Sequence, residues 1–403
     1  MKLAVILGDG MADWAVEALG GKTPLEAAHH PYMDRFARDG EFGLVKTVPD
    51  GMKPGSDTAN LSVFGYDPVR YYSGRSPLEA ASLGIDLADS DVTYRCNLVT
   101  LSEEANLADT TMIDYSAGEI STGEARELIE FLDARLSCEG VKLYPGFSYR
   151  HCLVLNDAET GAELTPPHDF TGNPVAGRLP SGTNAELLRA WMEEAYAVLK
   201  DHPVNQARVA AGKNPANAIW FWGEGRRPAL TPFLKKTGLH GAVISAVDLI
   251  QGIGRCAGME VVKVEGATGT YETNFAGKAA AAVDVLRRGA DYVYLHIEAA
   301  DECGHHGQVK EKVYSIEQID LQVIQPVFDY LEGCGEDYAI LVLPDHPTPL
   351  QIRTHSAEPV PYALYRKGDR AGRNVRYTES DAKTTGIYVE QGHLLIDRMK
   401  TID

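Results

Sequence analysis

The sequence predicts an α/β protein whose mostly parallel sheet is flanked by helices, with a smaller α+β domain inserted into the chain. Short continuous apolar runs alternate with helical patterns, which is typical of parallel strands covered on both faces. From residue 89 to residue 212 the pattern changes to alternating strands and amphipathic helices. The length of 403 residues allows two domains, so we expect a core at 1–88 and 213–403 and an inserted domain at 89–212.

The composition is that of an ordinary globular protein, with 44% hydrophobic and 24% charged residues. A net charge of −19 argues against non-specific binding to nucleic acid or to an anionic membrane. The apolar segment 1–7 is too short for a signal sequence and runs into Gly8-Asp9-Gly10, so we expect a cytoplasmic protein without a membrane span. Six scattered cysteines predict free thiols, and a homo-oligomer is compatible with the sequence.

The first elements of the core follow from local signals. Residues 3–7 form a buried strand, so Asp9 lies at a strand's carboxyl end, where open α/β sheets bind ligands. An ordinary turn aspartate is the equally weighted alternative. Thr23-Pro-Leu-Glu starts a helix with a capping box. A second helix at 31–38 and a strand at 43–48 follow.

Ser56 follows Gly55 and opens a helix whose apolar residues Leu61 and Phe64 are spaced three apart. The N-terminus of a helix offers free backbone N–H groups, so a serine there can meet a phosphate. From this segment alone, a plain N-cap serine is the favoured interpretation.

The inserted region is predicted to contain three strands and two helices. The strands are expected at 92–100, 141–144 and 151–155, and the helices at 119–132 and 184–200. In the core that follows, strands are expected at 217–222, 241–245, 260–264, 291–296 and 338–343, with helices at 275–288 and 309–331.

Polar residues follow several of these strands and turns. The set consists of Asp9, Ser56, Asp301, His305, Asp345, His346 and His355. Singly, Asp345 and His346 could cap an ordinary turn, and His355 could lie on a surface loop. Because parallel strands bring their carboxyl ends to one edge, the seven can converge. Three carboxylates, three imidazoles and a hydroxyl suffice for two divalent ions, and this mixture suits Mn²⁺ or Zn²⁺ better than Ca²⁺.

Several motifs in order along the chain carry a family resemblance. They are Gly-Asp-Gly-Met at 8–11, Pro-Gly-Ser-Asp-Thr-Ala-Asn-Leu-Ser at 54–62, Tyr-Arg-Cys-Asn-Leu-Val-Thr at 94–100, Ser-Ala-Gly-Glu-Ile-Ser at 116–121, Asp-Glu-Cys-Gly-His at 301–305, Pro-Asp-His-Pro-Thr-Pro at 344–349 and His-Ser-Ala-Glu-Pro-Val-Pro at 355–361. Together they resemble the cofactor-independent phosphoglycerate mutases, in particular the archaeal-type branch, within the alkaline phosphatase superfamily.

The resemblance implies an alkaline-phosphatase-like core, two divalent metal ions and a glycolytic function. Asp301, His305 and His355 would hold one ion. The second ion would be held by Asp9, Ser56, Asp345 and His346. Mn²⁺ is expected first, with Zn²⁺, Mg²⁺ or Co²⁺ as alternatives. Ser56 would be the nucleophile that carries the phosphoryl group while 3-phosphoglycerate and 2-phosphoglycerate interconvert.

A phosphorylated hydroxy acid also needs cationic groups around its carboxylate and phosphate. The candidates in the inserted domain are Arg95, Arg150 and His151, and those in the core are Arg226 and Lys278. Each could instead be a surface charge or part of an ion pair. Lys278 follows Asn-Phe-Ala-Gly, a segment that resembles one bearing a substrate-side lysine in the family, and is therefore the candidate with a catalytic role.

Two acidic residues depart from the family pattern. Glu298 stands where close relatives often have lysine, and Glu119 follows Ser-Ala-Gly where another residue is expected. Added acids oppose the binding of an anionic substrate. Another small hydroxy compound such as homoserine, or a phosphatase reaction, is therefore the alternative function within the same fold.

Overall fold

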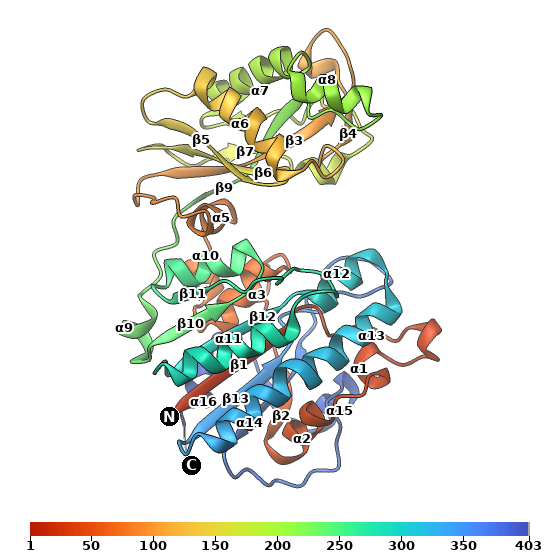
Figure 1. Cartoon of the computed structure of the whole chain (residues 1–403), viewed down its shortest axis with the longest axis vertical. Helices are drawn as coiled ribbons and strands as arrows, with labels where there is room; N and C mark the ends of the chain where they lie inside the picture. Colours follow the sequence, from red (N-terminus) through yellow and green to blue (C-terminus); the bar gives the residue numbers. More distant parts are fainter. Residues whose placement is uncertain (402–403) are drawn as a thin grey trace. The chain divides into compact units, whose positions relative to one another are not determined.

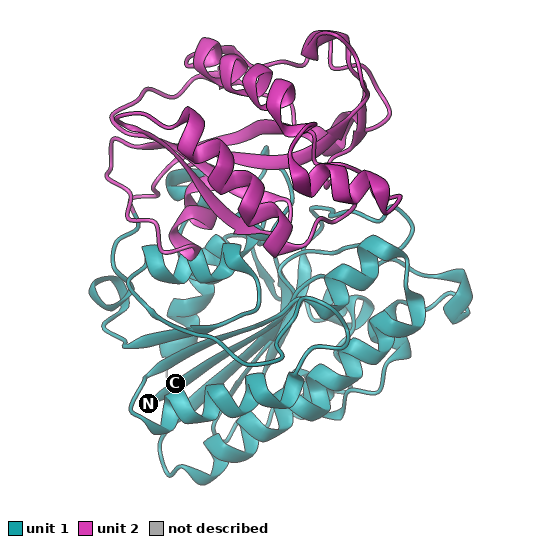
Figure 2. Ribbon diagram, turned by 45° about the horizontal axis from the view of Figure 1, so that its top comes forward, with its two compact units in different colours: residues 1–72, 230–403 teal, residues 73–229 magenta. Residues whose placement is uncertain are grey.

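The computed structural model describes residues 1–401. The chain forms two compact units, the first made of Met1–Tyr72 with Leu230–Asp403 and the second of Ser73–Ala229 (Figure 2). These boundaries differ from those expected at residues 89 and 212. The second unit also contains β9 (Ala218–Arg226), which pairs antiparallel with β3 (Val92–Leu101), and so the strand expected at 217–222 belongs to the second unit.

An eight-stranded sheet forms the centre of the first unit (Figure 1). The strands, in spatial order, are β11 (Glu260–Val262), β10 (Gly241–Ile244), β12 (Tyr292–Ile297), β1 (Lys2–Gly8), β13 (Tyr338–Leu343), β14 (Val360–Arg366), β2 (Glu41–Val45) and β15 (Tyr388–Val389). The first five run parallel, and β14 is antiparallel to both of its neighbours. The predicted α/β fold with a mostly parallel sheet is confirmed.

The central strand β1 explains how the sheet arranges its carboxyl edge. All seven of its residues are buried, as expected for a strand covered on both faces. Leu7 pairs with His296 of β12 on one side and with Leu343 of β13 on the other. The three strands therefore end side by side, and the residues that follow them lie at one edge of the sheet.

Helices cover the sheet of the first unit. They are α1 (Pro24–Ala27), α2 (Pro31–Asp39), α3 (Ser56–Val63), α4 (Pro68–Tyr71), α9 (Phe233–Thr237), α10 (Asp248–Cys256), α11 (Phe275–Arg287), α12 (Ala299–His306), α13 (Val309–Gln318), α14 (Gln325–Gly333), α15 (Glu379–Thr384) and α16 (Leu395–Lys400). Ala4 and Ile6 belong to a core cluster with residues of α2, α11 and α14. Leu3, Val5 and Leu7 alternate with them and are buried on the other face.

Two helix starts show how side chains set the local structure. Thr23 and Glu26 form the predicted capping box at the start of α1. A π-helical segment, Ile319–Ile324, joins α13 to α14. Its Asp320 accepts backbone hydrogen bonds from Tyr32 (3.1 Å) and Met33 (2.8 Å), and thereby caps the start of α2.

The second unit is an α+β structure with an antiparallel sheet in the order β4-β3-β6-β5, to which β9 adds on β3. Its further elements are α5 (Ser76–Ser82), β4 (Met112–Asp114), α6 (Thr122–Leu136), β5 (Val141–Phe147), β6 (Arg150–Leu155), β7 (Ala162–Glu163), β8 (Ser181–Gly182), α7 (Ala185–Leu199) and α8 (Pro203–Ala210). One core cluster joins α6 and α7 to one face of this sheet. Within residues 1–401, every helix is too short or too polar to cross a bilayer.

Candidate metal centre

Three neighbouring strands carry candidate ligands at their carboxyl ends. Asp9 directly follows β1, and Asp345 with His346 follows β13. Asp301 and His305 lie in α12, which begins two residues after β12, and their spacing of four residues places both on one face of the helix. The sheet register therefore brings groups from distant parts of the sequence together.

Ser56 faces this edge from the first position of α3. The N-cap of α3 is Gly55 and Ser56 is the first residue of the helix, so the interpretation of Ser56 as a plain N-cap is wrong. The Oγ atom of Ser56 lies 3.4 Å from Oδ2 of Asp9 and 3.2 Å from Nε2 of His346. The hydroxyl is thus directed at two candidate ligands.

Asp9, Asp345 and His346 form a first set of converging ligand atoms, all within 4.8 Å of one another. Nε2 of His346 lies 3.3 Å from Oδ2 of Asp345 and 3.7 Å from Oδ1 of Asp9. The three side chains are at most 1% exposed. This is a compact buried group of two carboxylates and one imidazole beside Ser56.

Asp301, His305 and His355 form a second set. The Nε2 atoms of the two histidines are 3.0 Å apart, and they lie 3.2 Å (His305) and 3.5 Å (His355) from the two carboxylate oxygens of Asp301. Nδ1 of His305 is 3.0 Å from the carbonyl oxygen of Arg353. A proton donated there leaves the Nε2 lone pair free to bind a cation.

The two sets adjoin each other. Asp301 and His355 also lie within 4.8 Å of a ligand atom of His346, and the rings of His346 and His355 are 4.2 Å apart. Asp9 and Asp301 further converge with Glu298, the acidic residue that the sequence marks as unusual. The centre therefore holds four carboxylates and three imidazoles.

The electrostatics of the centre fit divalent cations. Burial, together with the carboxylates of Asp345 and Asp301, raises the pKa of Asp9 well above its usual range. Oδ1 of Asp9 is buried and has no hydrogen-bond partner within the described part of the chain. Burial opposes protonation of His305, but its hydrogen bond with Asp301 outweighs this and raises the pKa of His305 to about 9. In the metal-free protein a proton on His305 therefore offsets the charge of Asp301, and a bound cation would take the place of that proton. A bound cation would offset the charge of the clustered carboxylates and would give the buried Oδ1 atom of Asp9 a partner.

Two side chains that the sequence did not single out hold these ligands. Asn60, one turn after Ser56, donates to Oδ2 of Asp345 (2.8 Å). Thr348 donates to Oδ1 of Asp301, and its oxygen lies 3.3 Å from Nδ1 of His346. Because the single hydroxyl proton goes to Asp301, His346 donates from Nδ1 and keeps its Nε2 lone pair toward Ser56.

Lys278 lies in α11 and is fully buried. Its Nζ atom is 3.5 Å from the carbonyl oxygens of Thr268 and His296. Burial lowers the pKa of Lys278 to about 8, although the charge of Glu298 opposes this shift. The amine therefore titrates close to neutral pH.

In the second unit, Arg95 and Arg150 share one face of the sheet. Arg95 pairs with Cys152, and two residues further along β3 Asn97 pairs with Arg150, which places both arginines on the same face. Nε of Arg95 lies 2.8 Å from Glu79, and its guanidinium is 4.1 Å from the ring centre of Trp222. The structure brings these two of the predicted substrate-binding residues together.

His151 and Arg226 are placed differently. His151 pairs with Cys96, so it points to the opposite, core face of the sheet from Arg95. Arg226 was expected in the core domain, which is wrong because it ends β9 in the second unit. Its guanidinium donates to the carbonyl oxygens of Ala158 (2.5 Å) and Asp89 (3.4 Å). Those two hydrogen bonds tie loops of the second unit together.

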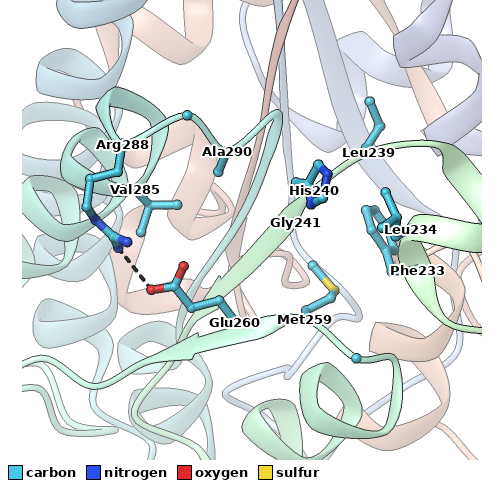
Figure 3. A pocket seen from close by; sticks show the side chains of 12 residues that line it. Phe233, Leu234, Leu239, His240, Gly241, Met259, Glu260, Val285, Arg288 and Ala290 are labelled. Carbon is cyan, nitrogen blue, oxygen red and sulfur yellow. Dashed lines mark hydrogen bonds and ion pairs between the residues drawn. The ribbon is translucent and has the colours of Figure 1, made fainter.

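A pocket of about 390 Å³ opens beside the amino ends of two strands of the large sheet (Figure 3). It is lined by the amino ends of β10 and β11 at Gly241 and Glu260, and an ion pair of 2.9 Å joins Glu260 to Arg288. The candidate ligands lie at the carboxyl ends of the strands. The pocket is therefore separate from the metal centre.

Residues 37–205 match the family model described as 2,3-bisphosphoglycerate-independent phosphoglycerate mutase. A protein of Geobacter sulfurreducens described as a probable member is 49% identical over 400 residues, covering 99% of each chain. The mutase of Methanosarcina barkeri is 52% identical over 369 residues, covering 91% of this chain and 90% of the relative.

Solved structures agree with the sequence relatives. The PH0037 protein from Pyrococcus horikoshii has a TM-score of 0.81 at 32% identity, covering 99% of this chain and 96% of that one. The cofactor-independent phosphoglycerate mutase from Thermoplasma acidophilum has a TM-score of 0.67 at 27% identity, covering 99% of both chains. The predicted family is thus confirmed, and the chain belongs to the 2,3-bisphosphoglycerate-independent phosphoglycerate mutases.

Proposed function

We propose that this chain interconverts 3-phosphoglycerate and 2-phosphoglycerate, a step of glycolysis and gluconeogenesis, through a phosphorylated Ser56. The observation that carries the proposal is the position of the Ser56 hydroxyl, within 3.4 Å of Asp9 and His346, at the N-terminus of α3. At the start of α3 a nucleophile lies beside converging metal ligands and backbone N–H groups. This arrangement suits the transfer of a phosphoryl group.

Two divalent cations fit the ligand sets. One would bind to Asp301, His305 and His355, and the other to Asp9, Ser56, Asp345 and His346. The mixture of carboxylate and imidazole donors favours Mn²⁺, with Zn²⁺, Mg²⁺ or Co²⁺ as alternatives. Bound cations stabilise a serine alkoxide at neutral pH and offset the charge of the phosphoryl oxygens.

The residues of the chain account for the rest of the reaction. Ser56 Oγ attacks phosphorus, and the bond between phosphorus and the 3-oxygen of glycerate breaks as the bond to Ser56 forms. The N–H groups at the start of α3 bind phosphoryl oxygens. The 2-hydroxyl of the retained glycerate then takes the phosphoryl group from Ser56. Exclusion of water during this interval prevents hydrolysis of the phosphoserine.

Lys278 is the proposed proton carrier for the glycerate oxygens, because a group with a pKa of about 8 can donate and accept protons near neutral pH. Arg95 and Arg150 of the second unit are the proposed partners of the substrate carboxylate. His151 and Arg226 remain weaker candidates for substrate binding. His151 points to the core face of its sheet, and Arg226 donates hydrogen bonds to backbone carbonyl groups. Both placements favour structural roles.

The test is a mutase assay with the metal-loaded protein. Conversion of 3-phosphoglycerate into 2-phosphoglycerate is followed with Mn²⁺, Zn²⁺, Mg²⁺ and Co²⁺ in turn, and without added bisphosphoglycerate. We expect turnover with at least one ion. Turnover with none of them would refute the proposed reaction.

Glu298 favours a second candidate, the phosphorylation of a hydroxy compound such as homoserine. It converges with Asp9 and Asp301, and a further carboxylate opposes a substrate with several negative charges. Homoserine with a phosphoryl donor is the substrate for a parallel assay. Product formation only in this second assay would select this candidate.

A further inference from the structure

His296 is a buried histidine between the ends of two strands that flank its own. It is the fifth residue of β12 and is 0% exposed. On one side, its Nε2 atom lies 2.9 Å from Oδ2 of Asp9, which follows β1. On the other side, its Nδ1 atom lies 3.2 Å from Oγ of Ser245, which follows β10. The parallel register of the three strands creates this row of contacts.

The chemistry of the partners fixes the direction of each hydrogen bond. An aspartate that ligates a metal is ionised and can only accept, so Nε2 of His296 must donate to it. The neutral ring then carries a lone pair on Nδ1, which accepts the hydroxyl proton of Ser245. The Ser245 oxygen accepts in turn from the backbone N–H of Val247 (3.0 Å). Each hydrogen-bond donor of this row therefore faces an acceptor.

This row engages one oxygen of Asp9 and leaves the other without a partner. Oδ2 accepts from His296 and faces Ser56 at 3.4 Å, whereas Oδ1 is buried, has no hydrogen-bond partner within residues 1–401 and lies 3.7 Å from Nε2 of His346. A carboxylate held at one oxygen by a rigid donor presents the other in a fixed direction.

We propose that His296 is a positioning residue of the metal centre: oriented by Ser245, it holds the Asp9 carboxylate so that Oδ1 is presented to the cation beside Ser56. This role rests on the proposed metal-dependent function. It assigns to His296 and Ser245 a part in metal binding that does not require either of them to touch the substrate.

The test measures Mn²⁺ binding by the full-length, metal-stripped protein with titration calorimetry. His296→Leu removes the donor, and we expect it to weaken binding by about 10- to 100-fold. His296→Gln keeps an N–H donor and should bind within about threefold of the unsubstituted protein. The matched control is His30→Leu, since His30 is also 0% exposed and its Nε2 lies 2.7 Å from the carbonyl oxygen of Leu25. It should leave Mn²⁺ affinity unchanged.

A spectroscopic measurement separates positioning from packing. With ¹⁵N-labelled histidine, the NMR spectrum of the Mg²⁺-loaded or Zn²⁺-loaded protein should show His296 neutral with its proton on Nε2. A proton on Nδ1, unchanged Mn²⁺ affinity in His296→Leu, or an equal loss in His30→Leu would overturn the role of His296. If the unsubstituted protein bound no divalent ion, this role and the proposed function would fail together, whereas mutase turnover with an unaffected His296→Leu would refute this role alone.

Discussion

Two buried groups of charges in the first unit are built on opposite principles. The metal centre gathers the carboxylates of Asp9, Asp301 and Asp345, and burial together with the other two carboxylates raises the pKa of Asp9. Lys312 and Asp13 instead form an ion pair of 2.7 Å with side chains that are 0% exposed, and Lys312 also donates to the carbonyl oxygen of Thr348 (2.8 Å). The pair is balanced within the chain, whereas Asp9 has carboxylate neighbours that oppose its ionisation.

The contrast teaches which substitutions affect stability and which affect activity. A balanced buried pair becomes costly only when one partner is removed, because the other charge is left unpaired. An unbalanced cluster already destabilises the fold, as functional sites often do. Substitution of one partner of the ion pair should therefore destabilise the protein, and substitutions in the metal centre should inactivate it.

The largest effect is expected for Ser56→Ala. Loss of the nucleophile should lower the mutase rate by about 10⁴-fold or more, while the melting temperature of the metal-free protein stays unchanged because no charge is removed. Mass spectrometry of the protein quenched during turnover should find a phosphate on Ser56 of the unsubstituted chain. Full activity in Ser56→Ala would refute the nucleophile.

Lys312→Met tests the balanced pair. It leaves the buried Asp13 without its cation, and we expect the free energy of unfolding in urea to fall by about 3–5 kcal/mol. The double variant Lys312→Met with Asp13→Asn leaves no buried charge and should recover part of the loss. Equal destabilisation of both variants would show that packing, and not charge balance, sets the cost.

Asp320 is an intermediate case, a lone carboxylate held by two backbone N–H groups. Burial raises its pKa to about 6, although the hydrogen bonds from Met33 and Tyr32 oppose the shift. An acid with a raised pKa in the folded state stabilises the protein below its unfolded pKa, and this contribution is lost as the pH rises from about 4 to about 6. Relative to Asp320→Asn, the unsubstituted protein should lose about 3 kcal/mol over this range. Parallel stability curves for the two proteins would contradict the shift.

The smallest effect is expected for Asp9→Asn in the metal-free protein. Removing one like charge should raise the free energy of unfolding by about 1 kcal/mol, while Mn²⁺ binding becomes weaker. Thermal unfolding with and without a chelator measures both effects. A destabilised metal-free variant would show that Asp9 supports the fold as an ordinary ion-paired residue does.

Much of the core was accessible from sequence patterns. The apolar run that precedes Asp9 and the one that precedes Asp345 form adjacent parallel strands, because continuous burial leaves few other arrangements for them. The convergence of Asp9, Ser56, Asp301, His305, Asp345, His346 and His355 followed from the shared carboxyl edge of the sheet. The position of a strand's carboxyl end can thus be predicted from sequence when the strand is buried and belongs to a parallel sheet.

The placement of the other candidate residues depends on which strands pair with one another, and local sequence patterns do not show this. β9 resembles a core strand in composition, and only its pairing with β3 places Arg226 in the second unit. His151 and Arg150 are neighbours in the sequence but lie on opposite faces of a sheet. The two side chains therefore cannot both bind a substrate on one face of that sheet. His296 is a polar residue next to the end of the apolar strand β12, which was the available signal for its place beside Asp9.

The most direct test of the central claim is the effect of Mn²⁺ on the stability of the metal-free protein. If the carboxylate cluster is balanced by bound cations, Mn²⁺ at 100 times its dissociation constant should raise the free energy of unfolding by about 2.7 kcal/mol for each site. Asp345→Asn should lose most of the gain that comes from the site it shares with Asp9 and His346. An unchanged stability in Mn²⁺, compared with sodium chloride of equal ionic strength, would contradict the account.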